Sequence, residues 1–529
     1  MRTAALGVAL GLSGAGALAQ STTPAPAPKS GWTVYAPGYN GLPSQGLAEL
    51  RTISAVDAIR RIDPQLGSVI ALDPTAIAQA RRVDAAGLRG PLAGQPVLIK
   101  DNIETAGPLP TTAGSLALAN NVTNRDAPLV ARLRAAGAVI VGKTNLSEWA
   151  NIRSNHSISG WSAVGGQTRN PWALDRNPCG SSSGSGAAVA AGLVRLAIGT
   201  ETDGSVTCPA AINGIVGLKP TVGLVSRTHI VPISHSQDTA GPMTASVREA
   251  AELLTAIAGS DPEDAATRDA GKHKRDYAAA LDSSSLKGKR IGVMRFASGF
   301  GTDTAFETAL ALLRERGATL VDIRKVEKFD DDELSANEQT VLRSELRADV
   351  AKYLKSSPAP IPVRTLADVI AFNQARAQQE MALFGQETFE QAEKTKGLSD
   401  PAYKKARENS FRMAAGAIDR LLKKHDVVAL VGPTMPPAWK IDAVNGDQSS
   451  GGGAGSLAAV AGYPHLTVPM GLVKGLPVGL SFIGPKWSEA LLLSLGYAYE
   501  QARGPFPAPK FYRSIEESPD IAPMLRPQR

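Results

Sequence analysis

Two serine-bearing glycine turns are the first candidates for chemistry in the sequence. Residues 179–186 read Cys-Gly-Ser-Ser-Ser-Gly-Ser-Gly, and residues 200–205 read Thr-Glu-Thr-Asp-Gly-Ser. They flank an Ala-rich helix expected at 187–192 and a strand expected at 196–199. A flexible Gly/Ser linker does not normally run into buried apolar elements on both sides. The pattern therefore indicates two turns in which the backbone approaches another group closely, with serine as a possible nucleophile.

A serine nucleophile in these turns would need a base other than histidine, because no histidine lies in either turn. Lysine can take that role if its amine is uncharged. Lys100 ends the apolar run 97–99, so its side chain begins inside the predicted sheet. Lowering a lysine pKa from about 10.4 to about 7 or 8 takes about 4 kcal/mol, which desolvation at a buried strand end can supply. Taken alone, an ordinary lysine at a strand end remains the simpler interpretation.

Two other motif matches are interpreted as accidental. Residues 137–144 match the phosphate-loop pattern Gly-x-x-x-x-Gly-Lys-Thr, but the four middle residues are Ala-Val-Ile-Val, which favours a strand over a wrapped turn. Residues 284–287 match the Ser-x-x-Lys of penicillin-recognising enzymes, but no Ser-Asp-Asn or Lys-Thr-Gly follows, and the segment is polar. Neither nucleotide hydrolysis nor β-lactam chemistry is expected.

Composition predicts a globular protein with a large core. Of 529 residues, 43% are hydrophobic and 20% are charged, and 56 Lys and Arg against 49 Asp and Glu leave a net charge of +7. The basic residues are scattered apart from short clusters at 272–275 and 287–290, so no nucleic-acid partner is expected. Two cysteines and six separate histidines exclude a disulfide framework and any recognisable zinc motif.

The N-terminus has the pattern of a secretory signal peptide. Residues 1–19 begin Met-Arg, continue as an apolar small-residue stretch and end Ala-Leu-Ala. Residues 20–40 form a Pro/Ala-rich leader, and a single domain is predicted at 41–529. No later run has the length of a membrane span without a charge, so the mature protein is expected to be periplasmic or secreted, with no membrane association.

Short β-rich runs alternate with longer amphipathic patterns along this domain. Strands are expected at 96–100, 138–142, 215–219, 290–294, 427–431 and 466–470. Helices are expected at 128–136, 247–258, 304–316, 401–424 and 488–503. This alternation predicts an α/β fold with a sheet covered by helices. The more charged stretch 330–424 has an almost entirely helical pattern and is predicted to be a helical insertion or cap.

The sequence resembles the amidase signature family of serine hydrolases from about residue 46 to residue 503. The matching segments are 94–102, 138–145, the two serine turns, 214–221, 240–243 and 475–484. The resemblance implies a large mixed β-sheet sandwiched between layers of α-helices. It also implies a relay of a lysine, a serine that follows a cis peptide bond and a nucleophilic serine, which here are Lys100, Ser181 and Ser205. The family's oxyanion hole falls on the backbone N–H groups of Thr202, Asp203, Gly204 and Ser205.

The sequence departs from the commoner family pattern at two places. Most members have Gly where Asp203 stands, and a carboxylate beside a developing negative charge would repel it, so the side chain is expected to point away. Several members have a carboxylate-binding arginine where Thr207 stands, followed here by Cys208. The segments 200–205, 207–209 and 237–243 look most like the peptide amidase branch, which releases ammonia from C-terminal peptide amides. Whether Cys179 and Cys208 form a disulfide stays open.

The sequence therefore predicts an exported amidohydrolase. It would cleave carboxylic or C-terminal peptide amides to an acid and ammonia or an amine, with neither metal nor organic cofactor, as a monomer or homodimer. One alternative is an aryl-amide, carbamate or ester hydrolase of the same family. Another is the catalytic subunit of a tRNA-dependent amidotransferase, which the signal peptide disfavours. Acyl and leaving-group preference would depend on the helical region and on loops at 436–439 and 462–464, which the sequence does not resolve.

Overall fold

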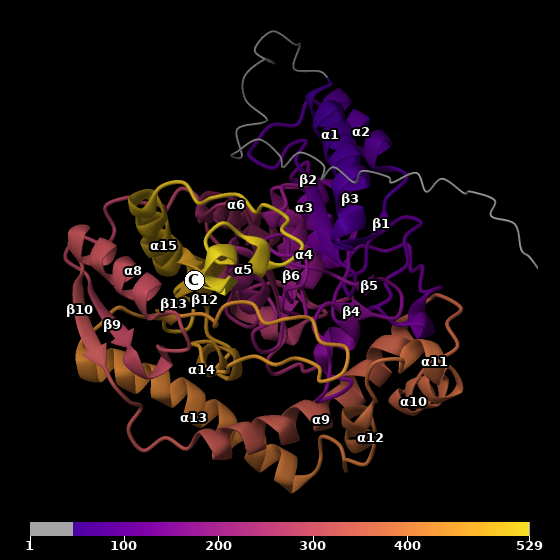
Figure 1. The fold of residues 1–529 in the computed structure, drawn as a ribbon. Helices are drawn as coiled ribbons and strands as arrows, with labels where there is room; N and C mark the ends of the chain where they lie inside the picture. The colour runs from indigo at the N-terminus through magenta and orange to yellow at the C-terminus, as the bar shows by residue number, and fades with distance from the viewer. Residues whose placement is uncertain (1–45, 528–529) are drawn as a thin grey trace, which may run out of the picture.

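The computed structural model describes residues 46–527 (Figure 1). The predicted signal peptide and leader lie outside the described residues, and the single-domain assignment stays a prediction. None of the helices between residues 46 and 527 has the length and apolar character needed to cross a membrane.

An 11-stranded mixed sheet forms the centre of the molecule, in the order β1-β3-β2-β6-β8-β7-β12-β13-β11-β9-β10. Its strands pair both parallel, as β2 does with β3 and β6, and antiparallel, as β12 does with β7 and β13. The strands are β1 (Val69–Leu72), β2 (Pro96–Lys100), β3 (Val139–Thr144), β6 (Leu196–Glu201), β7 (Val216–Lys219), β8 (Thr239–Thr244), β9 (Arg290–Met294), β10 (Thr319–Ile323), β11 (Ala429–Pro433), β12 (His465–Val473) and β13 (Leu476–Ile483). A separate small ladder joins β4 (Trp161–Ser162) and β5 (Gly166–Gln167).

Helices cover both faces of the sheet. Successive residues of a strand point to opposite faces, and the apolar side chains on each face are buried under helices. Val97 and Ile99 belong to an apolar cluster that includes residues of α3, α6, α8 and α15, whereas Leu98 belongs to a second cluster that includes residues of α1, α2 and α4. The helices are α1 (Leu47–Ile62), α2 (Ala76–Ala86), α3 (Pro128–Ala135), α4 (Ser183–Ala190), α5 (Thr207–Asn213), α6 (Val247–Ile257), α7 (Ala270–His273), α8 (Asp303–Glu315), α9 (Asp331–Ser356), α10 (Leu366–Ala375), α11 (Ala377–Glu380), α12 (Glu387–Glu393), α13 (Pro401–His425), α14 (Ser456–Val460) and α15 (Glu489–Arg503). The predicted amidase signature architecture, a mixed sheet between helical layers, is confirmed.

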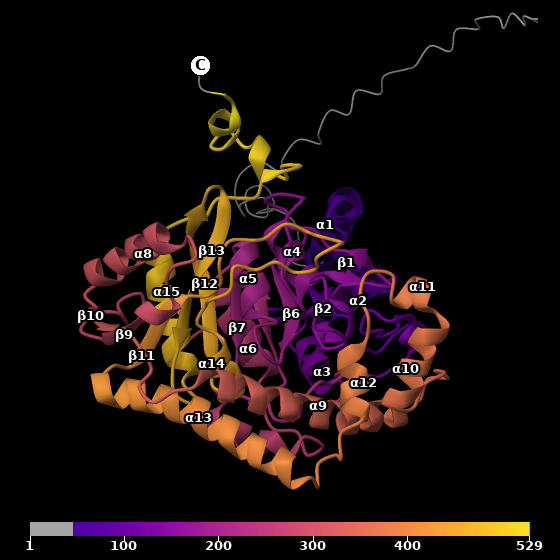
Figure 2. The same ribbon diagram turned by 60° about the horizontal axis from the view of Figure 1, so that its bottom comes forward.

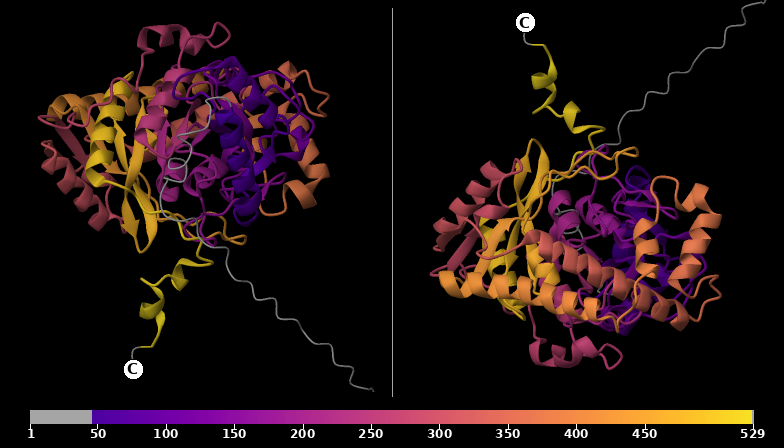
Figure 3. Two further views of the ribbon diagram at one scale, coloured as in Figure 1. Left: turned by 90° about the horizontal axis from the view of Figure 1, so that it is seen from above. Right: turned by 90° about the horizontal axis from the view of Figure 1, so that it is seen from below.

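The stretch 330–424 is almost entirely helical, as predicted. It forms α9 to α13, and the two long helices α9 and α13 pack against each other along one side of the molecule (Figure 2). On the opposite side the chain end at Ala522–Leu525 projects from the body (Figure 3).

The strands and helices expected from the sequence are present with small shifts at their ends, but four sheet strands are missing from the prediction. Two of them, β8 and β13, contain both Gly and Pro, which weaken any strand pattern read locally. The helix expected at 187–192 starts earlier than predicted, since α4 begins at Ser183. Its early glycines fit there because a side chain at Gly184 would collide with the backbone of Ser68 and Asn145.

Candidate active site

Lys100 lies at the carboxyl end of β2, fully buried, and its amine points at the first serine turn. Its Nζ is 2.7 Å from Ser181 Oγ, 2.8 Å from Thr200 Oγ1 and 3.2 Å from the Thr200 carbonyl oxygen. Asn102 Nδ2 donates to the same Thr200 hydroxyl at 3.0 Å. Among residues 46–527, the hydrogen-bond partners of the amine are therefore hydroxyl and carbonyl oxygens, and none is a carboxylate.

Burial lowers the pKa of Lys100 well below its ordinary value, because the charged form loses its hydration, while the more distant carboxylates of Glu201 and Asp238 act in the opposite direction. Lys143 on the neighbouring strand shows the contrast. Burial lowers the pKa of Lys143 too, but its amine lies 3.2 Å from Asp101 Oδ1, in an ion pair that favours the charged form and opposes the shift. Of these two lysines, Lys100 is the one placed to act as a neutral base.

Ser181 follows a cis peptide bond with Gly180, the feature that the resemblance implies. Glycine is required before it, because a side chain at 180 would collide with Ser147 Oγ. The Ser181 carbonyl accepts a hydrogen bond from the Ser147 N–H at 3.0 Å, and the Ser181 side chain is buried. The turn thus holds the Ser181 hydroxyl against the Lys100 amine.

Ser205 lies in the second turn, between β6 and α5, after Gly204 with its φ of +80°. Its carbonyl accepts from the Ser182 N–H at 3.1 Å, which ties the two serine turns together, and its residue surface is 8% exposed. The Ser205 and Ser181 hydroxyls make no hydrogen bond with each other. Catalytic hydrogen bonds often tighten only when substrate binds, so proton transfer between these hydroxyls would require them to come within hydrogen-bond distance.

Glu201 anchors the chain immediately after Ser205. One oxygen of its buried carboxylate accepts from the N–H groups of Val206 at 2.8 Å and Thr207 at 3.0 Å, at the beginning of α5. This satisfies donors at the start of α5 that lack intrahelical partners and places negative charge at the helix N-terminus, where it is stabilising. Sequence reasoning missed this residue, although an acidic side chain shortly before a helix start is a recognisable signal.

The loop 233–238 contacts both the second serine turn (200–205) and helix α9 of the helical insertion. Asp238 accepts from Thr202 Oγ1 at 2.6 Å. Gln237 Nε2 donates to the Thr202 carbonyl at 3.4 Å and to Glu338 Oε1 on α9 at 2.8 Å. Sequence reasoning noted Gln237 only as part of a segment that resembles peptide amidases and did not identify Glu338, because the contact between them joins segments about 100 residues apart.

Two further carboxylates on the same face of α9 hold this loop. Glu345 accepts from the Ser236 N–H at 3.0 Å, and Asp349 accepts from the His235 N–H at 2.9 Å. One group among the described residues is close enough together to hold a cation: His235, Glu345 and Asp349. All three already take part in the hydrogen bonds between the loop 233–238 and α9.

Asp203 is in an unusual electrostatic position. Burial raises the pKa of its carboxyl group well above the ordinary value, the nearby carboxyls of Glu338 and Glu201 raise it further, and Ser456 at the start of α14 opposes the shift through a hydrogen bond. This shift favours the neutral carboxylic acid over the carboxylate, which weakens the repulsion expected from the sequence. That its side chain points away from the oxyanion hole stays a prediction.

The two cysteines, left open by the sequence, form a disulfide in the structure, with their Cα atoms 6.1 Å apart. Cys179 lies two residues before Ser181, and Cys208 lies three residues after Ser205. The bond packs in an apolar cluster with Trp439. It therefore links the outer ends of the two serine turns.

We expect reduction of this disulfide to destabilise the fold. Its sequence separation of 29 residues corresponds to a stabilisation of about 3.5 kcal/mol in the chain-entropy model. Urea unfolding with and without reductant measures the loss, and a Cys179→Ala, Cys208→Ala double variant should be insensitive to reductant. Equal unfolding midpoints for the oxidised and reduced wild type would contradict the pairing.

The fold is that of the amidase signature enzymes, and comparisons with known proteins agree. A family model described as Amidase matches residues 52–493, so the chain belongs to the amidase family and is an amide-hydrolysing enzyme, as its resemblance predicts. The chain is 39% identical over 482 residues to a probable amidase of Arabidopsis thaliana, covering 89% of each.

Two further relatives define the range of similarity. The crystal structure of the peptide amidase PAM in complex with the competitive inhibitor chymostatin superposes with a TM-score of 0.83 at 51% identity, covering 89% of this chain and 96% of that one. A glutamyl-tRNA(Gln) amidotransferase subunit from Exiguobacterium sibiricum is 37% identical over 471 residues, covering 86% of this chain and 94% of the relative. The predicted resemblance to peptide amidase is thereby confirmed.

Proposed function

We propose that this chain is an exported amidohydrolase that releases ammonia from C-terminal peptide amides through an acyl-enzyme on Ser205. The observation that carries the proposal is the buried Lys100 amine, 2.7 Å from Ser181 Oγ and without a carboxylate partner. The likeness to a peptide amidase supports the choice of substrate. Export rests on residues 1–19, which lie outside the described residues.

In this mechanism the neutral Lys100 amine takes the proton of Ser181, and Ser181 takes the proton of Ser205 as the Ser205 oxygen attacks the amide carbonyl. The carbonyl oxygen becomes an oxyanion and accepts hydrogen bonds from the N–H groups of residues 202–205. The relay then returns the proton to the leaving nitrogen, and ammonia departs. Water attacks the acyl-enzyme by the same route, which releases the acid and restores Ser205.

The surroundings of the oxyanion favour a neutral substrate. The position of a carboxylate-binding arginine in other family members is occupied by Thr207, and Cys208 beside it is held in the disulfide. The raised pKa of the Asp203 carboxyl group disfavours a negative charge in the turn, so the backbone N–H dipoles can stabilise the developing oxyanion with less repulsion. An amide without a free acid group nearby fits these contacts best.

The test is ammonia release by the purified single chain. A peptide with a C-terminal amide is compared with the same peptide as a free acid, an aryl amide and an ester. We expect ammonia from the peptide amide at the highest kcat/KM. Preferential cleavage of the aryl amide or ester would favour the alternative hydrolase activity, and activity only after addition of partner subunits would favour an amidotransferase.

Gln237 is predicted to be a positioning residue for this reaction. The Thr202 carbonyl to which it donates belongs to the same peptide group as the Asp203 N–H, so Gln237 orients one donor of the oxyanion hole. Removing such a donor costs about 10² to 10³ in kcat, and misdirecting it should cost about ten-fold. We expect Gln237→Ala to lower kcat about ten-fold with KM nearly unchanged, in steady-state assays with the peptide amide.

The partner of Gln237 supplies the control. Glu338→Gln keeps an oxygen that can accept from Gln237, so its kcat should stay close to wild type. A Gln237→Ala, Glu338→Ala double variant should be no slower than Gln237→Ala alone, because both changes interrupt one chain of contacts. A rise in KM at constant kcat would show instead that Gln237 binds substrate.

A further inference from the structure

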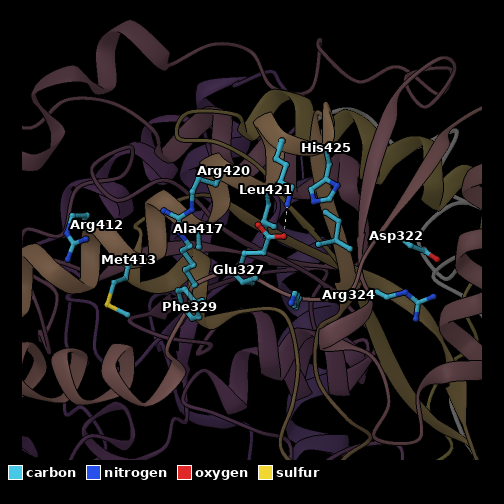
Figure 4. Close-up of a pocket in the computed structure, with 15 residues that line it drawn as sticks. Asp322, Arg324, Glu327, Phe329, Arg412, Met413, Ala417, Arg420, Leu421 and His425 are labelled. Atoms are coloured by element: carbon cyan, nitrogen blue, oxygen red, sulfur yellow. Dashed lines mark ion pairs between the residues drawn. The ribbon is translucent and has the colours of Figure 1, made fainter.

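A cavity remote from Ser205 lies on another part of the molecule. It has a volume of about 610 Å³, within the range of small-molecule sites, and it lies between the segment that follows β10 and the face of α13 (Figure 4). β10 is at the far end of the sheet order from β2 and β6, which hold the proposed catalytic groups. The cavity is therefore a second candidate binding site, separate from the amidase site.

The floor of this cleft is apolar. On α13, Met413, Ala417 and Leu421 recur every four residues and so lie on one face of the helix. Ile323 and Phe329 line the opposite wall. In Figure 4, Phe329, Met413 and Ala417 lie together towards one end of the cleft. Ala417, Leu421 and Ile323 are buried, so the apolar surface open to a ligand is that of the half-buried Met413 and Phe329.

The rim of the cleft is cationic. Its two acidic side chains are already engaged, Glu327 with Lys424 at 2.7 Å and Asp322 with Arg295 at 2.9 Å. The basic side chains that line it and make no ion pair with a described residue are Arg324, Lys325, Lys328, Arg412 and Arg420. Gathered like charges repel one another, and a bound anion would relieve that repulsion.

We propose that this cleft binds an amphipathic anion with a carboxylate head group and an unbranched apolar chain, of the fatty-acid type. Arg412 and Arg420 lie at the same end of the cleft as Met413 and Phe329 (Figure 4). Their guanidinium groups would bind the carboxylate through charge-assisted hydrogen bonds, and the apolar floor would cover the chain. The concave shape and apolar floor favour such a molecule over the surface of a larger acidic partner.

The experiment titrates decanoate into the full chain by isothermal titration calorimetry. An Arg412→Gln, Arg420→Gln double variant removes the head-group partners, and Arg60→Gln, Arg61→Gln, a pair of exposed arginines on α1, is the matched control. We expect the first double variant to weaken decanoate binding at least ten-fold and the control to leave it unchanged. Hydrolysis of the peptide amide should be unchanged in both.

Several results would overturn this proposal. Equal affinity for decyltrimethylammonium would show that charge plays no part, and decanoate affinity that survives in the Arg412→Gln, Arg420→Gln variant would place the ligand elsewhere, such as in the acyl site. Binding to anionic phospholipid vesicles that depends on the two arginines, without binding of free decanoate, would identify a membrane surface as the occupant instead.

Discussion

A Ser205→Ala variant should form no acyl-enzyme and should hydrolyse peptide amides slower by a factor on the order of 10⁶, the scale found when a serine nucleophile is removed. The remaining rate would come from substrate binding and the oxyanion N–H groups. The substitution should leave the fold intact, since the Ser205 hydroxyl makes no hydrogen bond with a described residue and alanine fits the turn. The free energy of unfolding should change by less than about 1 kcal/mol.

Two measurements make this result specific to Ser205. A serine-reactive fluorophosphonate should label the wild type on Ser205, as located by peptide mass spectrometry, and should not label the variant. Ser183→Ala is the matched control from the other turn; its hydroxyl donates to the Cys179 carbonyl at 2.6 Å and is not in the proposed relay. Labelling of another serine, or substantial turnover by Ser205→Ala, would refute the assignment of the nucleophile.

Replacing the proposed base, Lys100→Met, is expected to lower kcat/KM by a factor on the order of 10² to 10⁴, the usual contribution of a general base. In the wild type, only the neutral amine can accept the proton of Ser181. The rate should therefore rise with pH through the lowered pKa of Lys100, and this acidic limb should be absent from the pH profile of the variant. An unchanged acidic limb in Lys100→Met would assign it to another group.

The pH dependence of folding stability gives an independent test of the lowered pKa of Lys100. In the unfolded chain Lys100 has an ordinary pKa of about 10.4, whereas burial lowers the pKa in the folded state. Between those two pKa values the unfolded state binds more protons, so this group disfavours folding most at low pH, and the penalty fades as pH rises towards 10.4. Lys100→Met removes the penalty, and its stability relative to wild type should therefore increase as pH falls.

Lys143→Met is the matched comparison, because Lys143 is also a buried lysine at the end of a strand. Its removal would leave the Asp101 carboxylate buried without its cation, which typically costs about 3 to 5 kcal/mol. We expect Lys143→Met to lower thermal stability, whereas Lys100→Met should lower kcat/KM for the peptide amide. The same loss of stability in both variants would indicate that Lys100 has a structural role only.

Much of the architecture was predictable from the sequence, because it depends on local patterns. Arg290–Met294 and Pro96–Lys100 are short, apolar runs whose residues alone favour buried strands, and α13 is amphipathic over its length. The serine turns were visible as Gly/Ser segments between apolar elements. The resemblance, carried by motifs at defined positions, added the residues of the relay and the fold.

Contacts between distant segments were decided by the tertiary structure. Ser181 and Thr200 meet the Lys100 amine although they lie 81 and 100 residues away, and burial at that meeting point lowers the pKa of the amine. Three other features depend in the same way on which segments the fold brings together. They are the hydrogen bond of Glu338 on α9 to Gln237, the disulfide, and the cationic cleft. Periodicity reports which face of an element is apolar, but not which element will cover it. The residue types and local structure of this enzyme therefore follow from its sequence, whereas the charge state and partners of its site follow from packing.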